Sequence, residues 1–290
     1  METRNNMTGF VLLGLTQNPK LQKVIFAVFL VVYIVSIVGS VLTLVTITAS
    51  PLLGCPMYFF LSHLSFTDAY YSSVNNLKLA VDSFHKTKTS PFNECITQIF
   101  GEQLFGGTDV ILLTVMAYDR YVVIRKPLHY TTIMNWQLCW LLIGVVWVRS
   151  FLHATIQILF IFRLPSYGLN VIDHLMCDLN PLLNLACTDT HTLGLFVAAN
   201  SGFLRLLHFP LFMGSYVVIV RSLRTHSLEA RHKALSTCVS HITAVIIFLV
   251  ACIFVYLRPA ATFPIDKAVT VFYAMITPML NPLIYTLRNA

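Results

Sequence analysis

The stretch between Lys23 and Asp68 contains no charged residue. A membrane-spanning helix needs about 20 apolar residues, because the hydrocarbon core is roughly 30 Å thick and each helical residue rises about 1.5 Å. The uncharged stretch is too long for one such helix, and the segment Ser50–Pro56, which holds two prolines and a glycine, divides it. We therefore expect two successive membrane spans in this part of the chain.

Further apolar segments follow, and they bring the expected number of spans to seven. The spans are residues 24–49, 57–80, 96–119, 137–161, 193–220, 238–257 and 268–287. With 57% hydrophobic and only 11% charged residues, the chain has too little polar surface to cover a water-soluble globule. We therefore predict an all-α membrane protein in which residues 1–290 form one seven-helix bundle with short loops.

Basic residues are distributed unevenly between the two sets of loops. They outnumber acidic residues by six in the loops after the first, third, fifth and seventh spans, and by two in the remaining loops and the N-terminal segment 1–23. Cytoplasmic loops carry the excess of Lys and Arg, so we expect the N-terminus outside. Asn6, in Asn6-Met7-Thr8, agrees, because this glycosylation acceptor functions on the luminal side. The net charge of +7 then suits an anionic membrane surface, and we expect no nucleic-acid partner.

Seven cysteines are present, and three of them fall on the outer side of this topology. Cys95 begins the third span, whereas Cys177 and Cys187 lie in the long outer loop of residues 162–192. The other four lie within spans or on the cytoplasmic side, where thiols stay reduced. We expect a disulfide between Cys95 and Cys177 that pins the loop to the third span. The alternative is a pair of unlinked cysteines.

Four groups of motifs occur in order along the chain. They are Pro56-Met57-Tyr58-Phe59-Phe60-Leu61 opening the second span, Met116-Ala117-Tyr118-Asp119-Arg120-Tyr121 closing the third and followed by Pro127-Leu128-His129-Tyr130, Lys233-Ala234-Leu235-Ser236-Thr237-Cys238 before the sixth, and Pro278-Met279-Leu280-Asn281-Pro282-Leu283-Ile284-Tyr285 in the seventh. Together they resemble the vertebrate olfactory receptors, a family of rhodopsin-like G-protein-coupled receptors, over essentially the whole chain. The resemblance implies a multi-pass plasma-membrane receptor that binds a small volatile odorant and activates a heterotrimeric G protein of the stimulatory olfactory type.

The resemblance also assigns the residues of coupling and activation. They are Asp119, Arg120, Tyr121, Tyr216, Asn281, Pro282 and Tyr285. Arg120 reaches water at the cytoplasmic border and can pair with Asp119, and an exposed pair of this kind contributes only ~0–1 kcal/mol. Such a pair suits a latch that a modest rearrangement opens. Pro282 removes a backbone hydrogen bond and kinks its span, and by resemblance Tyr216 meets Arg120 and Tyr285 in the active state.

Two carboxylates, Asp68 and Asp109, fall in the middle of predicted spans. A buried ionised group costs much free energy, so each must be protonated, paired or bound to a cation. In the rhodopsin-like fold these two positions approach Asn281 at the centre of the bundle. A sodium ion or a shared proton suits this arrangement, and the alternative is a hydrogen-bonded polar knot that packs the helices. We expect no other cofactor.

By resemblance, the ligand pocket lies between the outer halves of the third, fifth, sixth and seventh spans. The residues at matching depth are Gln103, Gly106, Gly107, Asn200, Leu204, Cys252, Tyr256 and Tyr273. They make an apolar cavity with a few hydrogen-bonding groups, which suits a small volatile molecule. Each of them is as well suited to helix packing as to ligand contact.

Several positions depart from the pattern of this family. Ser40 stands for Asn in the first span, Arg125 for Cys after the third, Tyr167 for Cys in the long loop and Leu249 for an aromatic residue in the sixth span, and the chain ends at Ala290, before the family's amphipathic cytoplasmic helix. Arg149 and Arg205 lie inside spans, where an arginine costs ~2.5–3.5 kcal/mol on insertion scales. Pairing with Glu102 or Asp109, or reaching the headgroups, would remove that cost.

The functional hypotheses belong to different classes. The leading one is an odorant receptor that raises cyclic AMP. A rhodopsin-like receptor for another small molecule outside the nose, and a relic of the family that no longer signals, are the alternatives. A transporter is disfavoured, because no inverted repeat with broken helices occurs in the two halves. An enzyme is not expected, because no metalloprotease, hydrolase or nucleotide-binding motif is present.

Overall fold

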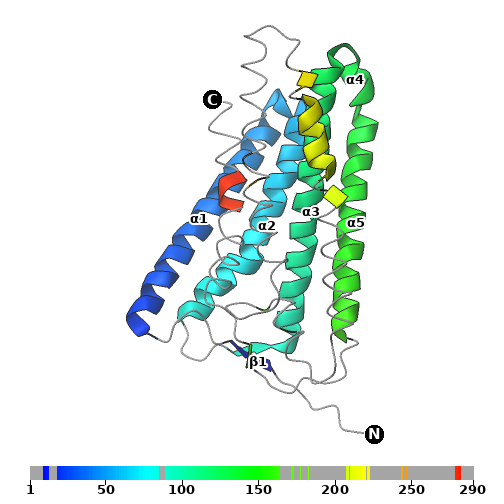
Figure 1. Cartoon of the computed structure of the whole chain (residues 1–290). Helices are drawn as coiled ribbons and strands as arrows, with labels where there is room; N and C mark the ends of the chain where they lie inside the picture. The colour runs from blue at the N-terminus through cyan, green and yellow to red at the C-terminus, as the bar shows by residue number, and fades with distance from the viewer. Residues whose placement is uncertain are drawn as a thin grey trace.

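The computed structural model describes residues 9–12, 18–84, 89–162, 171–172, 177, 182, 207–208, 210–219, 221–222, 243, 246 and 278–281. Four long helices lie side by side in it (Figure 1), namely α1 Pro19–Ala49, α2 Pro56–Phe84, α3 Phe92–Arg125 and α5 Trp136–Phe162. Each contains one of the first four spans predicted from the sequence and extends beyond it at one end or both.

Parts of the last three predicted spans are also described. Pro210–Ile219 is an apolar helix within span 193–220, Thr243 and Ile246 are helical within span 238–257, and residues 278–281 are helical within span 268–287. The rest of these spans lies outside the described residues. So do the predicted glycosylation site Asn6, the loop position Tyr167, and Arg205 and Leu249.

Short helical turns make the breaks between the long helices. Between α1 and α2 lies η1, Pro51–Gly54, and the Ser50 side chain accepts a hydrogen bond from the Leu52 amide at its start. Between α3 and α5 lie η2, Pro127–His129, and α4, Tyr130–Ile133. Both η1 and η2 begin with a proline, which lacks the amide that a continuing helix needs. Each proline therefore marks where a long helix has ended.

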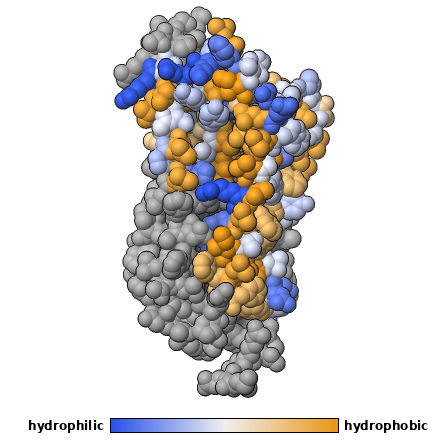
Figure 2. Space-filling view, turned by 90° about the vertical axis from the view of Figure 1, so that its right-hand side faces the viewer, coloured by the Kyte–Doolittle hydropathy of each residue, from blue (hydrophilic) through white to orange (hydrophobic). Residues whose placement is uncertain are grey.

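The helix α1 carries polar residues on its buried side and apolar residues on its outer side. Ser36, Ser40 and Thr43 are at most 3% exposed, whereas Val31 and Leu42 are 59% and 61% exposed. A surface helix of a soluble protein has the reverse arrangement. Apolar side chains also stand exposed along α5, and hydrophobic residues cover much of the described part of that side in Figure 2. Both helices therefore present the surface that lipid accepts.

The helix α2 differs from the other three long helices. By length and composition, α1, α3 and α5 are apolar enough to cross a membrane, and α2 is not among the described helices that meet this measure. Its polar residues lower its hydropathy, and many of them face the inside of the bundle. The buried ones are Ser62, Ser65, Thr67, Asp68, Ser72 and Asn75. Among the described residues, α2 thus contributes a substantial share of the polar interior.

Three short strands lie at the end of the bundle opposite to α4 (Figure 1), and the sequence did not predict them. The strand β1, Gly9–Leu12, is the middle one, and it pairs antiparallel with β2, Thr89–Pro91, and parallel with β3, Val171–Ile172. Phe10 of β1 is fully buried in a small apolar cluster. The other buried members of the cluster are Cys95, Ile99, Ile161, Ile172, Cys177 and Leu182.

The disulfide between Cys95 and Cys177 that the sequence predicts is present. Cys95 lies in the first turn of α3, and Cys177 follows β3 along the chain. Both cysteines are fully buried in the same cluster as Phe10. The N-terminal strand, the start of α3 and the segment after β3 are therefore held together by one covalent bond and one small core.

We expect Phe10→Ala to reduce the amount of folded receptor strongly, because truncating a buried phenylalanine removes about 3–5 kcal/mol. Val11→Ala is the matched control, since the neighbouring Val11 is 37% exposed on the same strand. Flow cytometry of an N-terminal epitope tag on intact cells measures both variants against the wild type. Equal surface staining of the two variants would contradict a structural role for the buried ring of β1.

Candidate functional site

The helix α3 ends in the segment that carries Asp119, Arg120 and Tyr121. Its last residue is Arg125, and the amide of Lys126 donates to the carbonyl of Val122 to close the final turn. Arg125, one of the departures from the family pattern, is exposed there and faces water. A cation in the last turn of a helix interacts favourably with the partial negative charge of that end. Arg125 is therefore compatible with the local structure.

Asp119 is fully buried, and its partner is Tyr130 of α4. The Tyr130 hydroxyl donates to Oδ1 of Asp119 at 2.9 Å, whereas Oδ2 of Asp119 has no hydrogen-bond partner. Burial, followed by the neighbouring Asp119 carboxylate, raises the pKa of Tyr130 above its ordinary value, so the phenol remains a donor. The carboxylate is thus held by a neutral group that lies beyond the end of α3.

The expected ion pair between Asp119 and Arg120 is absent from the structure. The guanidinium lies close enough to act electrostatically on the carboxylate, but neither a hydrogen bond nor a salt bridge joins the two side chains. Adjacent residues on a helix point in different directions, about 100° apart, which explains the separation. The sequence-based expectation was wrong on this contact, and the partner it missed, Tyr130, stands in the Pro127-Leu128-His129-Tyr130 motif.

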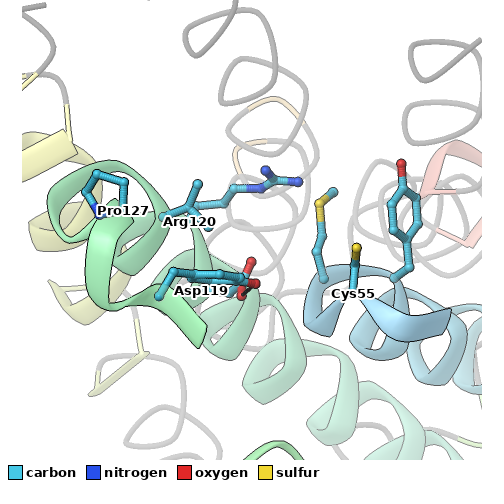
Figure 3. Close-up of a pocket in the computed structure, with 8 residues that line it drawn as sticks. Cys55, Asp119, Arg120 and Pro127 are labelled. Carbon is cyan, nitrogen blue, oxygen red and sulfur yellow. Dashed lines mark hydrogen bonds between the residues drawn. The ribbon is translucent and has the colours of Figure 1, made fainter. Parts of the chain in front are cut away.

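A cavity of about 390 Å³ opens beside these residues at the cytoplasmic end. Figure 3 shows the Arg120 side chain reaching into it from α3, with Cys55 on the opposite wall at the start of α2. The lining residues are Cys55, Met57, Tyr58, Asp119, Arg120, Val123, Pro127 and Tyr130. The cavity therefore combines a cation, a buried carboxylate and two phenols in one accessible space.

Tyr216, a further predicted coupling residue, is buried in the helix Pro210–Ile219. Its ring lies 4.7 Å from that of Phe212 between centroids, and both belong to the apolar cluster that contains Met116 and Ala117 of α3. The structure therefore places Tyr216 in the same apolar core as the cytoplasmic half of α3. Pro282 and Tyr285 lie outside the described residues.

The mid-membrane carboxylates do come together with Asn281. The Asn281 amide donates to both oxygens of Asp68 at 3.1 Å, and the Thr67 hydroxyl donates to Oδ1 of Asp109. Asp68 and Asp109 are also close enough to repel each other electrostatically. The Ser40 hydroxyl on α1 is fully buried and has no hydrogen-bond partner among the described residues. Ser40 makes no hydrogen bond to Asp68, Asp109 or Asn281, which agrees with the departure from Asn at this position.

The described members of the predicted ligand pocket lie on α3. Gln103 is only 5% exposed, and Gly106 faces Tyr71 of α2. A methyl group placed on Gly107 would lie 3.7 Å from the Ser150 hydroxyl and 3.9 Å from the His153 ring, so Gly107 faces α5. The other members, Asn200, Leu204, Cys252, Tyr256 and Tyr273, lie outside the described residues.

Sequence reasoning overlooked two buried amides, Asn75 of α2 and Gln98 of α3. Both are at most 3% exposed, and neither the oxygen nor the nitrogen of either side chain has a hydrogen-bond partner. An unpaired buried amide costs free energy, so such groups are available to an added polar partner. Polar residues within an otherwise apolar span were the signal that could have identified them.

Arg149, one of the arginines within spans, lies in the middle of α5. Its Nε is buried without a hydrogen-bond partner, and the side chain pairs with neither Glu102 nor Asp109. Its guanidinium acts electrostatically on His208, whose Nδ1 lies 3.1 Å from the Thr114 hydroxyl. The described structure thus offers Arg149 no acidic partner, and its insertion cost is not removed by pairing.

Comparison with known proteins gives consistent results at the level of family and fold. A family profile described as olfactory receptor matches residues 29–290. The chain is 56% identical to Olfactory receptor 4A47 and 54% identical to Olfactory receptor 4A5, both of Homo sapiens, over all of its length and 94% and 92% of theirs. The crystal structure of squid rhodopsin has a TM-score of 0.75 and 19% identity, covering 92% of this chain and 77% of that one. The seven-helix fold class predicted from the sequence is thereby confirmed.

We expect Tyr130→Phe to raise ligand-independent signalling, because a hydrogen bond to a charged group contributes about 1.5–3 kcal/mol and its loss leaves both oxygens of Asp119 without a partner. Each 1.4 kcal/mol shifts an equilibrium tenfold, so basal cyclic AMP per surface receptor should rise about tenfold. Tyr118→Phe is the matched control, since Tyr118 is 42% exposed one residue before Asp119. Basal output that is the same in both variants would show that Tyr130 does not restrain the site.

Proposed function

Because this chain belongs to the olfactory receptor family, we propose that a small volatile odorant binds in the outer half of its helix bundle, activates a stimulatory G protein of the olfactory type and so raises cyclic AMP. As a member of that family, the chain is an odorant-sensing G-protein-coupled receptor of the plasma membrane, crossing it several times, and a signalling receptor rather than an enzyme. The class of odorant and the type of G protein are the parts that we propose.

The observation that supports coupling most directly is the cytoplasmic cavity. Arg120 reaches into it with no hydrogen bond to the neighbouring Asp119, so its donors are available to a carbonyl or carboxylate of a docking protein. Asp119 is held meanwhile by Tyr130, which lies on the segment between α3 and α5. Movement of that segment would release Asp119. The segment between α3 and α5 is therefore a suitable contact for an incoming G protein.

The transmission path runs through the polar group at mid-membrane. Thr67 and Asp68 belong to α2, Asp109 to α3 and Asn281 to the seventh span, so their hydrogen bonds join three helices at one depth. Gln103 lies six residues, about 9 Å, above Asp109 on α3, since each residue rises about 1.5 Å. A ligand that shifts the outer half of α3 therefore acts on this group, and a change of hydrogen-bond partners there shifts the population of active receptor.

The predicted pocket also suits an odorant with one hydrogen-bonding group. Gln103 is a buried amide in the outer half of α3, and the unpartnered amides of Asn75 and Gln98 lie on the same half of α2 and α3. A side-chain amide donates through its nitrogen and accepts through its oxygen, so alcohols, esters, ketones and acids are the favoured classes. A purely hydrocarbon ligand would leave these groups unpaired.

The alternatives remain distinguishable by experiment. A receptor for a small molecule outside the nose would share the pocket and the coupling site, and only its ligand would differ. The reading as a relic that no longer signals is favoured by two observations, the unpartnered Ser40 hydroxyl and the unpaired Arg149. A relic would fail to signal even when it reaches the surface.

We expect Arg120→Ala to abolish odorant-dependent cyclic AMP while surface staining is retained. The wild type is first screened against a panel of alcohols, esters, ketones and acids to find an agonist. Arg125→Ala is the matched control, because this arginine is exposed at the end of the same helix and does not line the cavity. Odorant-dependent signalling that survives in Arg120→Ala would refute the coupling role, and a wild type that is silent at normal surface levels would support the relic.

We also propose that a sodium ion or a shared proton sits between Asp68 and Asp109. Two carboxylates that repel each other in an apolar interior cannot both remain charged without a cation, and the neutral donors Thr67 and Asn281 do not supply one. A bound cation would add charge balance to the layer that joins the three helices. It would also hold them in the arrangement described.

If sodium occupies this position, replacing Na⁺ with a large organic cation should raise basal nucleotide exchange in receptor-bearing membranes. Asp109→Asn should remove this sodium dependence, because it removes one of the two charges, and Asn93→Asp at the exposed start of α3 adds a carboxylate elsewhere as a control. Basal exchange that is independent of sodium in the wild type would favour the shared proton instead.

A further inference from the structure

Cys55 is a free, exposed thiol in the wall of the cytoplasmic cavity. Figure 3 shows its sulfur on the side of the cavity that faces the Arg120 side chain. Its backbone is well anchored, because its carbonyl accepts hydrogen bonds from the amides of Tyr58 at 3.0 Å and Phe59 at 3.1 Å. Cys55 is thus the residue between η1 and α2, and the first turn of α2 holds its backbone in place.

Two charged groups without matched partners face the same space. Oδ2 of Asp119 is buried and lacks a hydrogen-bond partner, although Oδ1 is bonded to Tyr130. Within the part of the chain that the structure describes, the Arg120 guanidinium makes neither a hydrogen bond nor a salt bridge. A complementary occupant would therefore carry both an ammonium group, for the carboxylate, and a carboxylate group, for the guanidinium. The structure offers this pair of charges beside a free, exposed thiol.

We propose that Cys55 is a site of S-glutathionylation on the cytoplasmic face of this receptor. Glutathione is the cytosolic thiol whose chemistry fits the cavity, since it is a tripeptide with one ammonium and two carboxylate groups. The volume of about 390 Å³ lies within the range of roughly 300–1,000 Å³ that small-molecule sites occupy. Arg120 selects for the carboxylates of the tripeptide, and Oδ2 of Asp119 accepts a hydrogen bond from its ammonium group.

The reaction is a thiol–disulfide exchange with glutathione disulfide. The Cys55 thiolate attacks one sulfur of the disulfide, a new bond forms between that sulfur and Cys55, and the old sulfur–sulfur bond breaks. The second glutathione leaves as a thiolate with the electron pair and takes up the proton that the Cys55 thiol released. Cys55 is oxidised and one glutathione is reduced, so no other oxidant is needed. Excess reduced glutathione reverses the exchange.

The consequence rests on the proposed function, in which Arg120 meets a G protein through this cavity. A tripeptide attached to Cys55 fills the cavity and occupies the donors of Arg120, so the G protein loses access to them. Coupling would then fall when the cytosol becomes oxidising and recover when reduced glutathione returns. The odorant site in the outer half of the bundle is untouched by this modification.

The first test measures the adduct itself. Receptor in lipid nanodiscs is treated with glutathione disulfide, digested and analysed by mass spectrometry, and Cys55 should carry a glutathione adduct that dithiothreitol removes. Cys139 is the internal control, because it is free but fully buried in α5 and should remain unmodified. Equal modification of Cys55 and Cys139 would overturn the proposal, as would a fatty acyl group, rather than glutathione, on Cys55 of receptor isolated from oxidant-treated cells.

The second test asks whether the cavity recognises glutathione. Arg120→Gln should slow the reaction of Cys55 with glutathione disulfide up to about fivefold, the effect of one partly exposed charge pair. It should leave unchanged the reaction with methyl methanethiosulfonate, which carries no charge. Equal slowing of both reactions would mean that the variant altered only access to the thiol, and no slowing of either would mean that Arg120 takes no part. Both outcomes contradict recognition by the cavity.

The third test links the adduct to signalling. Odorant-stimulated nucleotide exchange is measured in membranes before and after treatment with glutathione disulfide, and each variant is compared with its own untreated value. The wild type should lose most of its response and regain it with reduced glutathione, whereas Cys55→Ser should keep its own response. A loss of equal size in Cys55→Ser would refute the link. A wild type with no response before treatment would instead refute the proposed function, while the adduct measurement would still stand.

Discussion

Lipid offers no hydrogen bonds, so every polar side chain within a membrane span must find its place inside the bundle. The arrangement of α1 and α2 follows from this constraint. The helix α1 turns Ser36, Ser40 and Thr43 inward, and α2 brings Asp68 and its serine, threonine and asparagine neighbours to the same interior. The apolar side chains of α1 and α5 correspondingly face outward, toward the lipid. The polar interior then provides the groups on which a switch can be built.

The carboxylates of this interior share one mode of restraint. Thr67 donates to Asp109, Asn281 donates to Asp68, and Tyr130 donates to Asp119. In each case the donor is a neutral group, and it lies on a different element from the carboxylate that it binds. Neutral donors can be exchanged for water, an ion or a partner protein at modest cost. The bundle therefore positions its carboxylates through hydrogen bonds that can be exchanged during activation.

The sequence predicted those features that depend on length, composition and motif. The uncharged stretch before Asp68 required two helices, and the outer-side location of Cys95 and Cys177 indicated their disulfide. Features that depend on direction in space were not predictable in this way. The bond from Tyr130 to Asp119 requires the turn that η2 makes, and the contact of Gly107 with α5 requires the relative rotation of two helices. The apolar run of β1 is too short for its periodicity to identify a strand.

The sheet also has a consequence for how the chain is made. Its middle strand, β1, emerges first from the ribosome, yet its second neighbour, β3, exists only after residue 171 has been synthesised. Until then at least one edge of β1 is left in the lumen with unpaired amides and carbonyls, which are open to other chains or to chaperones. Completion of the sheet therefore requires that the first four helices have already been inserted in the right orientation. The N-terminal strand serves as a built-in check on the biosynthesis of the first half of the receptor.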